Sequence, residues 1–320
     1  MSRRPALIAA ALLVVALAVV WTGFRRDIAA RTAELSAAAT LTDTPHGPVA
    51  HARGGGGAGP LVLALHGAGG GHDQGALLAR AFLPARVPWI APSRFGYPGT
   101  PMPADASTAA QADALAALLD TLGADRVVVL AMSGGVPPAL QLALRHPGRV
   151  QALVLISLAP YAPLTAEEQA LPVPIWLYDA LFASDFPFWA ALHLLPGRLA
   201  PLFDARPELR AQQTPAEAAF VDAMTRHFLP VTLRRAGLAN EGAAIDPAAA
   251  IDPAAIAAPV LILHARDDRL TPVSTALFTA DRIAGAEVEI YDSGGHLLLG
   301  RHAAARARIT DFLGRHTPTP

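Results

Sequence analysis

Three side chains that could cooperate in nucleophilic catalysis lie at the ends of separate apolar runs of this chain. Ser133 follows the apolar run 126–130 and stands among small residues in the segment AMSGG. A serine in a sharp strand-to-helix turn exposes its hydroxyl above the sheet, and its neighbours at minus two and plus two must be small. A serine hydroxyl is a weak nucleophile unless a base stands beside it and a third group orients that base. The pattern predicts a nucleophile at Ser133 that needs an acid and a histidine.

The acid and the histidine follow in the order that such a turn requires. The segment HARDDRLTP comes directly after an apolar run and carries Asp267 and Asp268. The segment DSGGH comes after the next apolar run and ends at His296. Because open parallel sheets bind ligands beyond the carboxyl ends of their strands, we expect these groups to meet Ser133 at one sheet edge.

The elements that must position these residues are strands and helices in alternation. Nearly continuous apolar runs predict strands that are buried on both faces of a parallel sheet. These runs are Leu61–Leu65, Pro88–Ala91, Arg126–Leu130, Ala152–Ser157, Pro259–His264 and Glu287–Tyr291, with a further β-segment near Gly47–Arg53. Helices are predicted at Asp73–Phe82, Ser107–Leu122, Pro137–His146, Pro272–Ile283 and Arg301–Leu313, with a capping box at Thr108–Gln111. The alternation predicts an α/β domain with right-handed crossovers.

About 100 residues between Ala159 and Ala258 interrupt this alternation. They include helical signals such as the segment TPAE at 214–217, in which a cap residue, a first-turn proline and a capping-box acid stand in order. We interpret residues 161–258 as a helical cap over the carboxyl edge of the sheet.

The cap is rich in aromatic residues, six of the 19 in the chain falling between positions 176 and 189. Trp176, Phe182, Phe186 and Trp189 are the candidates for an apolar acyl or aryl pocket over the nucleophile. Packing between cap and sheet, or insertion of the cap into lipid, are the alternatives.

The N-terminus carries a run of 20 uncharged residues, Pro5–Phe24, flanked by arginine pairs. A helix of that length spans about 30 Å, the hydrocarbon thickness of a bilayer. The run exceeds the apolar region of a usual signal peptide. We therefore expect residues 1–26 to be an uncleaved membrane anchor rather than a signal segment, and residues 27–46 to be a tether. The soluble domain is expected outside the cytoplasm.

Composition excludes several classes of site. The net charge of −1, with arginine as the sole basic residue type, gives no general electrostatic footprint for nucleic acid. The absence of cysteine excludes disulfides, a thiolate nucleophile and cysteine metal sites. His72 and Asp73 have no second pair at ligand spacing, so no metal is expected. His66 and His264, at strand ends, are expected to be hydrogen-bonding scaffold.

Taken together, the motifs resemble those of the α/β-hydrolase family in its capped serine-hydrolase form. The segment HGAGGG at 66–71 matches the family's His-Gly loop, and SRFGYPGT at 93–100 resembles the loop after the next strand. Asp268 stands four residues before Pro272, and Gly-Gly-His opens the last helix, in the family's spacing. The resemblance covers residues 47–315. It implies an eight-stranded, mostly parallel sheet with a core at 47–160 and 259–320 and a cap after strand six.

The resemblance also implies roles for individual residues. Ser133 would be the nucleophile, His296 the general base and Asp268 the orienting acid, with Asp267 as the rival for the last role. After strand six the segment SLAP offers no acid, so the alternative acid position of some relatives is empty.

The oxyanion requires two backbone donors. Gly134 N–H, which follows the nucleophile, is one. Ala68 is the better second candidate and Gly69 the fallback. Arg94 and Tyr97 could bind a substrate carboxylate or fasten their own loop.

The sequence favours a membrane-tethered serine hydrolase that cleaves an ester of an apolar or moderately sized acid through an acyl-enzyme, with no cofactor or metal. Its expected partners are a small ester-like substrate and a bilayer. One alternative is a cofactor-free hydrolase of carbon–carbon bonds in vinylogous diketones. The other is a non-catalytic member of the fold that binds a lipid or a protein partner.

Overall fold

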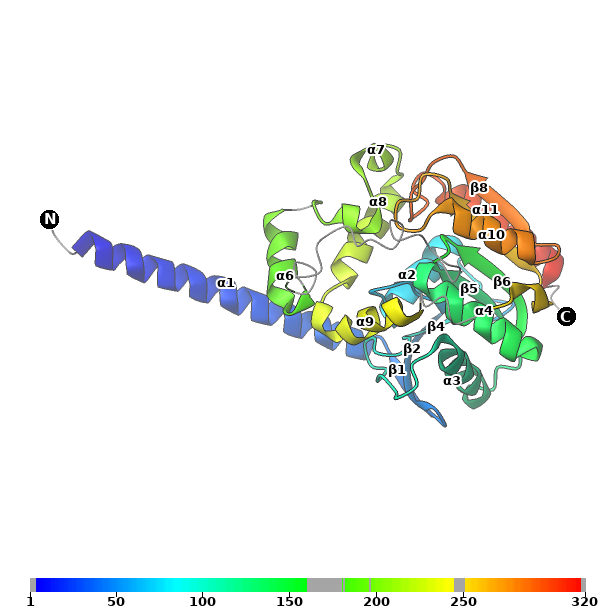
Figure 1. Ribbon diagram of the computed structural model, residues 1–320. Helices are drawn as coiled ribbons and strands as arrows, with labels where there is room; N and C mark the ends of the chain where they lie inside the picture. The colour runs from blue at the N-terminus through cyan, green and yellow to red at the C-terminus, as the bar shows by residue number, and fades with distance from the viewer. Residues whose placement is uncertain (1–3, 160–179, 181, 196, 245–250, 318–320) are drawn as a thin grey trace.

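An eight-stranded, mostly parallel sheet forms the centre of the protein (Figure 1), as the sequence predicts. The computed structural model describes residues 4–159, 180, 182–195, 197–244 and 251–317. The strands are β1 (Thr40–Thr44), β2 (Gly47–Gly54), β3 (Val62–Leu65), β4 (Trp89–Pro92), β5 (Val127–Met132), β6 (Val150–Ile156), β7 (Val260–Ala265) and β8 (Glu287–Tyr291). Their order is β1-β2-β4-β3-β5-β6-β7-β8. Strand β2 is antiparallel to both of its neighbours, and the remaining pairs are parallel.

Helices cover both faces of the sheet. They are α2 (His72–Phe82), α3 (Thr108–Thr121), α4 (Val136–Arg145), α10 (Val273–Arg282) and α11 (His302–His316). Side chains of α2 and α11 pack with one set of strand residues, and those of α3, α4 and α10 pack with the other. In β5, for instance, Val128 and Leu130 join the first set while Val129 and Ala131 join the second. This explains why the strand is apolar at every position.

The described part of the cap region is helical. It holds α6 (Asp185–Leu194), α7 (Pro207–Arg210), α8 (Pro215–His227) and α9 (Arg235–Ala244). Helix α8 begins with the predicted capping box, in which Thr214 N donates to Glu217 Oε2 at 2.7 Å. The other oxygen of Glu217 accepts the N–H of His302 at 3.0 Å, so this glutamate also fastens the cap to the start of α11.

Helix α1 (Arg4–Ala37) projects from the body of the protein over its first half (Figure 1). Its 34 residues correspond to about 50 Å of helix. The apolar side chains between Leu7 and Trp21 are exposed. The helix is long and apolar enough to cross a membrane, a property that membrane anchors share with signal sequences.

Within the segment predicted to be a tether, 27–46, helix α1 continues to Ala37 and β1 begins at Thr40. Contacts with distant parts of the chain hold this segment in place. Asp27 Oδ2 accepts the indole N–H of Trp189 on α6 at 2.8 Å. Arg31 pairs with Asp73 at the start of α2. These contacts stabilise a segment whose local composition looks like that of a linker.

The start of α3 also differs from the predicted capping box. Ser107 is the N-cap and accepts Ala110 N–H at 3.1 Å. Gln111, predicted to close the box, instead accepts the N–H of Phe95 at 2.7 Å. The side chain is therefore used to hold the loop that follows β4.

Candidate active site

The strand-to-helix turn after β5 carries Ser133 in a strained conformation. Its φ is +53°, a region that residues with a Cβ rarely occupy and that often marks functional sites. Ala131 is buried, and a Cβ on Gly135 would lie 2.7 Å from the carbonyl oxygen of His66. Small residues are therefore required on both sides, and Ser133 itself stays partly exposed at the carboxyl edge of the sheet.

Asp268 lies after β7 with both carboxylate oxygens bound. Oδ1 accepts the N–H groups of Leu270 and Thr271, each at 2.9 Å, and Oδ2 accepts the Thr271 hydroxyl at 2.8 Å. Oδ2 also accepts Nδ1–H of His296 at 2.9 Å. Burial raises the pKa of Asp268, but the neighbouring His296 and these hydrogen bonds outweigh it and lower the pKa to about 2. The carboxyl group is therefore ionised at neutral pH and has a fixed orientation.

His296 lies after β8 and is held in one tautomer by this contact. Because Nδ1 carries the proton donated to Asp268, Nε2 is left with a free lone pair. Burial lowers the pKa of His296, whereas the charge and hydrogen bond of Asp268 raise it, and the balance lies above the ordinary 6.5. This combination is typical of a general base.

The loop after β6 ties the serine turn to the histidine loop. Ala159 N donates to Ser133 O at 3.3 Å, and Ser157 Oγ donates to His296 O at 2.7 Å. Ser157 is buried and has a φ of +46°. The nucleophile and base candidates are thus attached to one short segment, which occupies the place where some relatives carry an acid.

Asp267, the rival acid, braces the histidine loop from the other side. Its Oδ1 accepts the N–H groups of Gly294 and Gly295 at 3.0 and 2.9 Å, and its Oδ2 accepts from Arg206 at 2.9 Å. Asp267 contacts the backbone of the histidine loop, whereas Asp268 contacts the imidazole of His296. The geometry therefore separates the two adjacent carboxylates.

A cap residue that the sequence analysis did not single out, Asp204, also contacts the histidine loop. Its Oδ2 accepts the backbone N–H of His296 and of Arg269, each at 3.1 Å, and its Oδ1 pairs with Arg206 Nε at 2.9 Å. Asp204 is buried and has a φ of +58°. Burial raises its pKa above the usual range for aspartate. No local motif in the sequence marks this residue, because the two residues whose backbone it binds, Arg269 and His296, lie more than 60 positions away.

The two predicted oxyanion donors lie side by side. A Cβ placed on Gly134 would lie 3.2 Å from Ala68 N, so the backbone of the His-Gly loop passes directly over the serine turn. A Cβ on Gly67 would likewise lie 3.0 Å from the Cβ of Ser133. A larger residue at either glycine would force the loop and the turn apart.

His66 and His264 serve as neutral scaffold. His66 Nδ1–H donates to Gly67 O at 2.7 Å, and its Nε2 accepts the N–H of Arg94 at 3.0 Å. His264 Nε2–H donates to Thr271 O at 3.0 Å. Burial lowers the pKa of both histidines, so each remains uncharged at neutral pH.

Arg94 and Tyr97 fasten their loop and also reach the site. Arg94 is buried, and its Nε and Nη2 donate to the carbonyls of His66 and Gly67, each at 3.0 Å. The Tyr97 hydroxyl accepts Gly69 N–H at 3.1 Å. Both side chains also bind Glu241 of α9, a second residue that the sequence analysis missed.

The aromatic residues predicted to line a pocket have other contacts. Phe186 and Trp189 pack on Phe24 of α1, with ring centroids 5.2 and 5.5 Å apart. Phe182 packs on Phe228, which follows α8, at 5.6 Å. Trp176 lies outside the described residues. The cap aromatics thus connect the cap to α1 and to itself, an arrangement that the sequence could not distinguish from a pocket.

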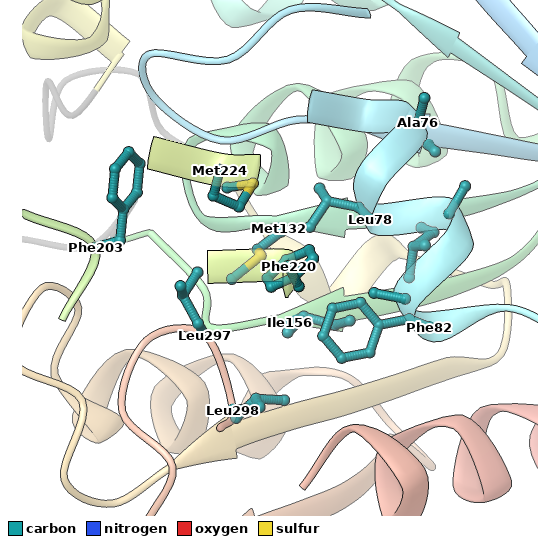
Figure 2. Packing of buried hydrophobic residues seen from close by; sticks show 14 of the residues in the cluster. Ala76, Leu78, Phe82, Met132, Ile156, Phe203, Phe220, Met224, Leu297 and Leu298 are labelled. Carbon is teal, nitrogen blue, oxygen red and sulfur yellow. The ribbon is translucent and has the colours of Figure 1, made fainter. Parts of the chain in front are cut away.

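Different apolar side chains flank the candidate catalytic residues. Figure 2 shows Met132, which precedes Ser133, and Leu297, which follows His296, gathered near Phe203, Phe220 and Met224 of the cap. These residues belong to one buried apolar cluster. The chemistry would therefore take place beside an apolar wall. Within the described ranges, no group of three or more histidine, aspartate or glutamate side chains is arranged to hold a metal ion.

Comparison with known proteins gives consistent matches. The model of the alpha/beta hydrolase fold family matches residues 60–303. The chain is 31% identical to 2-hydroxymuconate semialdehyde hydrolase of Pseudomonas sp. strain CF600, over 80% of this chain and 88% of that one. It is 30% identical to pimeloyl-[acyl-carrier protein] methyl ester esterase of Aromatoleum aromaticum, over 74% and 91%. Among solved structures, a bacterial membrane phospholipase A is similar over 99% of this chain and 100% of its own, with a TM-score of 0.62 and 22% identity.

Proposed function

The chain belongs to the α/β-hydrolase family, and from that premise we propose that it is a serine hydrolase that cleaves esters through an acyl-enzyme. The observation that carries the proposal is the Asp268–His296 hydrogen bond beside a strained serine turn. A binding protein has no need of a buried ionised acid, an oriented imidazole and a partly exposed serine at one sheet edge. This proposal does not depend on the aromatic residues that the sequence offered as pocket candidates, which are Trp176, Phe182, Phe186 and Trp189.

In the proposed mechanism, Ser133 Oγ attacks the ester carbonyl carbon while His296 Nε2 accepts the hydroxyl proton. The carbonyl oxygen becomes an oxyanion that Gly134 N–H and Ala68 N–H stabilise. The C–O bond to the alcohol then breaks, and the leaving oxygen takes the proton from His296. A water molecule releases the acid by the same steps, and Asp268 stabilises the imidazolium each time it forms.

The proposed substrate is an ester of an apolar or moderately sized acid. The apolar side chains of Met132 and Leu297, the chain neighbours of Ser133 and His296, belong to a buried apolar cluster and favour an acyl group with an apolar chain next to the ester carbonyl. The relative from Aromatoleum aromaticum, a methyl ester esterase, supports ester chemistry on this scaffold.

Cleavage of a carbon–carbon bond is the second candidate, because a relative with 31% identity is a 2-hydroxymuconate semialdehyde hydrolase. The same serine, histidine and aspartate would serve either reaction. The two candidates differ in the bond that breaks and therefore in the assay that detects turnover.

We also propose that α1 remains attached as a membrane anchor, that residues 161–258 form the cap, and that the catalytic domain lies outside the cytoplasm. Removal of α1 would leave Asp73 without Arg31 and the indole N–H of Trp189 without Asp27. Loss of these contacts would expose protein surface that α1 covers while it remains attached. A reporter fused to the C-terminus tests the orientation: activity of a cytoplasm-specific reporter would contradict it.

The experiment that tests the proposed function is pre-steady-state hydrolysis of p-nitrophenyl esters of increasing chain length by the full chain in detergent. An acyl-enzyme mechanism predicts a burst of p-nitrophenol of about one equivalent per enzyme when deacylation is slower than acylation. Ser133→Ala should abolish the burst and the turnover, whereas Ser274→Ala, an exposed serine on α10, should leave both unchanged. Turnover of a vinylogous diketone with no ester turnover would favour the second candidate. No turnover of either substrate by folded protein would count against catalysis.

A further inference from the structure

A carboxylate from the cap lies beside the two oxyanion donors. Glu241 Oε2 lies only 2.6 Å from the point where a Cβ on Gly134 would stand, and Ala68 N lies 3.2 Å from the same point. Glu241 is largely buried, with 12% of its side chain exposed. An acidic oxygen therefore fills the space next to the place where a reacting carbonyl oxygen must sit.

The other oxygen of Glu241 is bound by two groups of the loop after β4. Oε1 accepts the Tyr97 hydroxyl proton at 2.6 Å and pairs with Arg94 Nη2. Arg94 cannot follow Glu241 elsewhere, because two further hydrogen bonds hold its guanidinium to the backbone of the His-Gly loop. The hydrogen-bond donors Arg94 and Tyr97 are thus fixed on the core, whereas the accepting carboxylate of Glu241 belongs to the cap.

This arrangement conflicts with catalysis. The oxyanion of the proposed mechanism would form within a few ångströms of the Glu241 carboxylate, and two negative charges at that distance repel strongly in a buried site. Glu241 must therefore leave the site before reaction. Helix α9 is held to the core at Gly237, whose N–H donates to Gly96 O at 3.1 Å, and at Asn240, whose side-chain amide donates to Ala106 O at 2.9 Å. The helix can therefore stay in place while the Glu241 side chain turns to another rotamer.

Departure of Glu241 leaves the guanidinium of Arg94 and the hydroxyl of Tyr97 facing the site without their anion. A buried cation without a partner is costly, and another carboxylate would restore the pairing. A ligand that brings its own carboxylate therefore replaces the lost contacts, whereas a neutral ligand does not.

We propose that Arg94 and Tyr97 form a carboxylate-binding subsite beside the oxyanion donors, that Glu241 occupies it in the free enzyme, and that the substrate is an ester bearing a free carboxylate that displaces Glu241. The identification of the substrate as an ester rests on the proposed function; the subsite itself does not. The proposal assigns the cap a role in selecting substrates through charge.

Paired esters test the proposal in the full chain. Mono-p-nitrophenyl esters of succinate, glutarate and adipate are compared with neutral p-nitrophenyl esters of the same chain length. Removing the competing charge in Glu241→Gln should raise the ratio of kcat/KM for the carboxylated over the neutral ester at least tenfold above the wild-type ratio. Adding Tyr97→Phe to that variant should lower the ratio again. Glu289→Gln, which removes a carboxylate from β8 outside the site, should keep the wild-type ratio. An unchanged ratio in folded Glu241→Gln would overturn the proposal.

A binding measurement separates the subsite from the hydrolase proposal. Glutarate should raise the melting temperature of Glu241→Gln more than that of the wild type, and Tyr97→Phe should abolish the rise. If no ester is hydrolysed, the hydrolase proposal fails and this shift alone decides the subsite. A rise that requires Tyr97 supports it, and no rise in Glu241→Gln refutes it.

Discussion

Replacement of Asp268 by asparagine should change the pH dependence of the enzyme as well as its rate. The carboxylate lies 2.9 Å from His296 Nδ1, and both groups are buried. Two unit charges about 4 Å apart interact by roughly 4 kcal/mol at an effective dielectric constant of about 20. The charge of Asp268 therefore favours the imidazolium form of His296 and raises its pKa against the opposing effect of burial.

The direction in which the pH midpoint should move follows from the opposing effects of charge and burial on His296. With Asp268 present, the pKa of His296 lies above 6.5, so kcat/KM should fall as the pH drops through a midpoint above 6.5, where the base becomes protonated. Without the charge, burial dominates, and the midpoint should fall below 6.5. Loss of about 4 kcal/mol of support for the imidazolium should also lower kcat/KM at pH 8 about 10³-fold.

The matched control is Asp267→Asn, which removes the adjacent carboxylate. Its contacts are with Gly294, Gly295 and Arg206, so the midpoint of the acid limb should stay above 6.5. The assay is kcat/KM for one p-nitrophenyl ester between pH 5 and pH 9. A midpoint that does not move in Asp268→Asn, or one that moves as far in Asp267→Asn, would refute the assignment of the acid.

Further substitutions test the surrounding architecture. Asp204→Asn should lower kcat about five- to tenfold with little change in KM, because the hydrogen bond from the backbone N–H of His296 loses its charged acceptor; steady-state kinetics measure this split. Asp73→Asn should lower the free energy of unfolding by about 3–5 kcal/mol, since fully buried Arg234 loses its anion; urea titration followed by tryptophan fluorescence measures the loss. The pKa of Asp73 lies well below 3.8, so the stability it contributes is present above pH 3.8 and should decline in the wild type as the pH falls below that value. Gly135→Ala should reduce both stability and activity, because its Cβ would lie 2.7 Å from a carbonyl oxygen, whereas Gly148→Ala, where nothing lies within 4 Å, should change neither.

The sequence predicted seven of the eight strands and placed Ser133, Asp268 and His296 after three of them, and the reason is physical. Strands such as β5 are buried on both faces, so their continuous apolar runs cannot be mistaken for surface segments. Ser133, Asp268 and His296 each follow such a run, and parallel strands bring their carboxyl ends to one edge. The position of each residue directly after a predicted strand was therefore enough to predict that all three lie at the same edge of the sheet.

Residues whose positions depend on contacts between distant segments could not be found in this way. Asp204 and Glu241 reach the site from the cap, and no spacing rule connects either residue with its partners. The same reason applies to the segment predicted to be a tether, in which Asp27 accepts a hydrogen bond from Trp189, 162 positions further along the chain. The sequence showed that aromatic residues are concentrated in the cap, but it could not show that Phe186 and Trp189 pack on Phe24 of α1.

The central claim is that Ser133 is the nucleophile, and covalent labelling tests it most directly. The folded full chain is treated with a fluorophosphonate, digested and analysed by mass spectrometry. We predict a single phosphonyl adduct on Ser133, which forms faster at pH 8 than at pH 5 and is lost in His296→Ala. An unlabelled wild-type protein that retains its fold, or an adduct on another serine, would contradict the account.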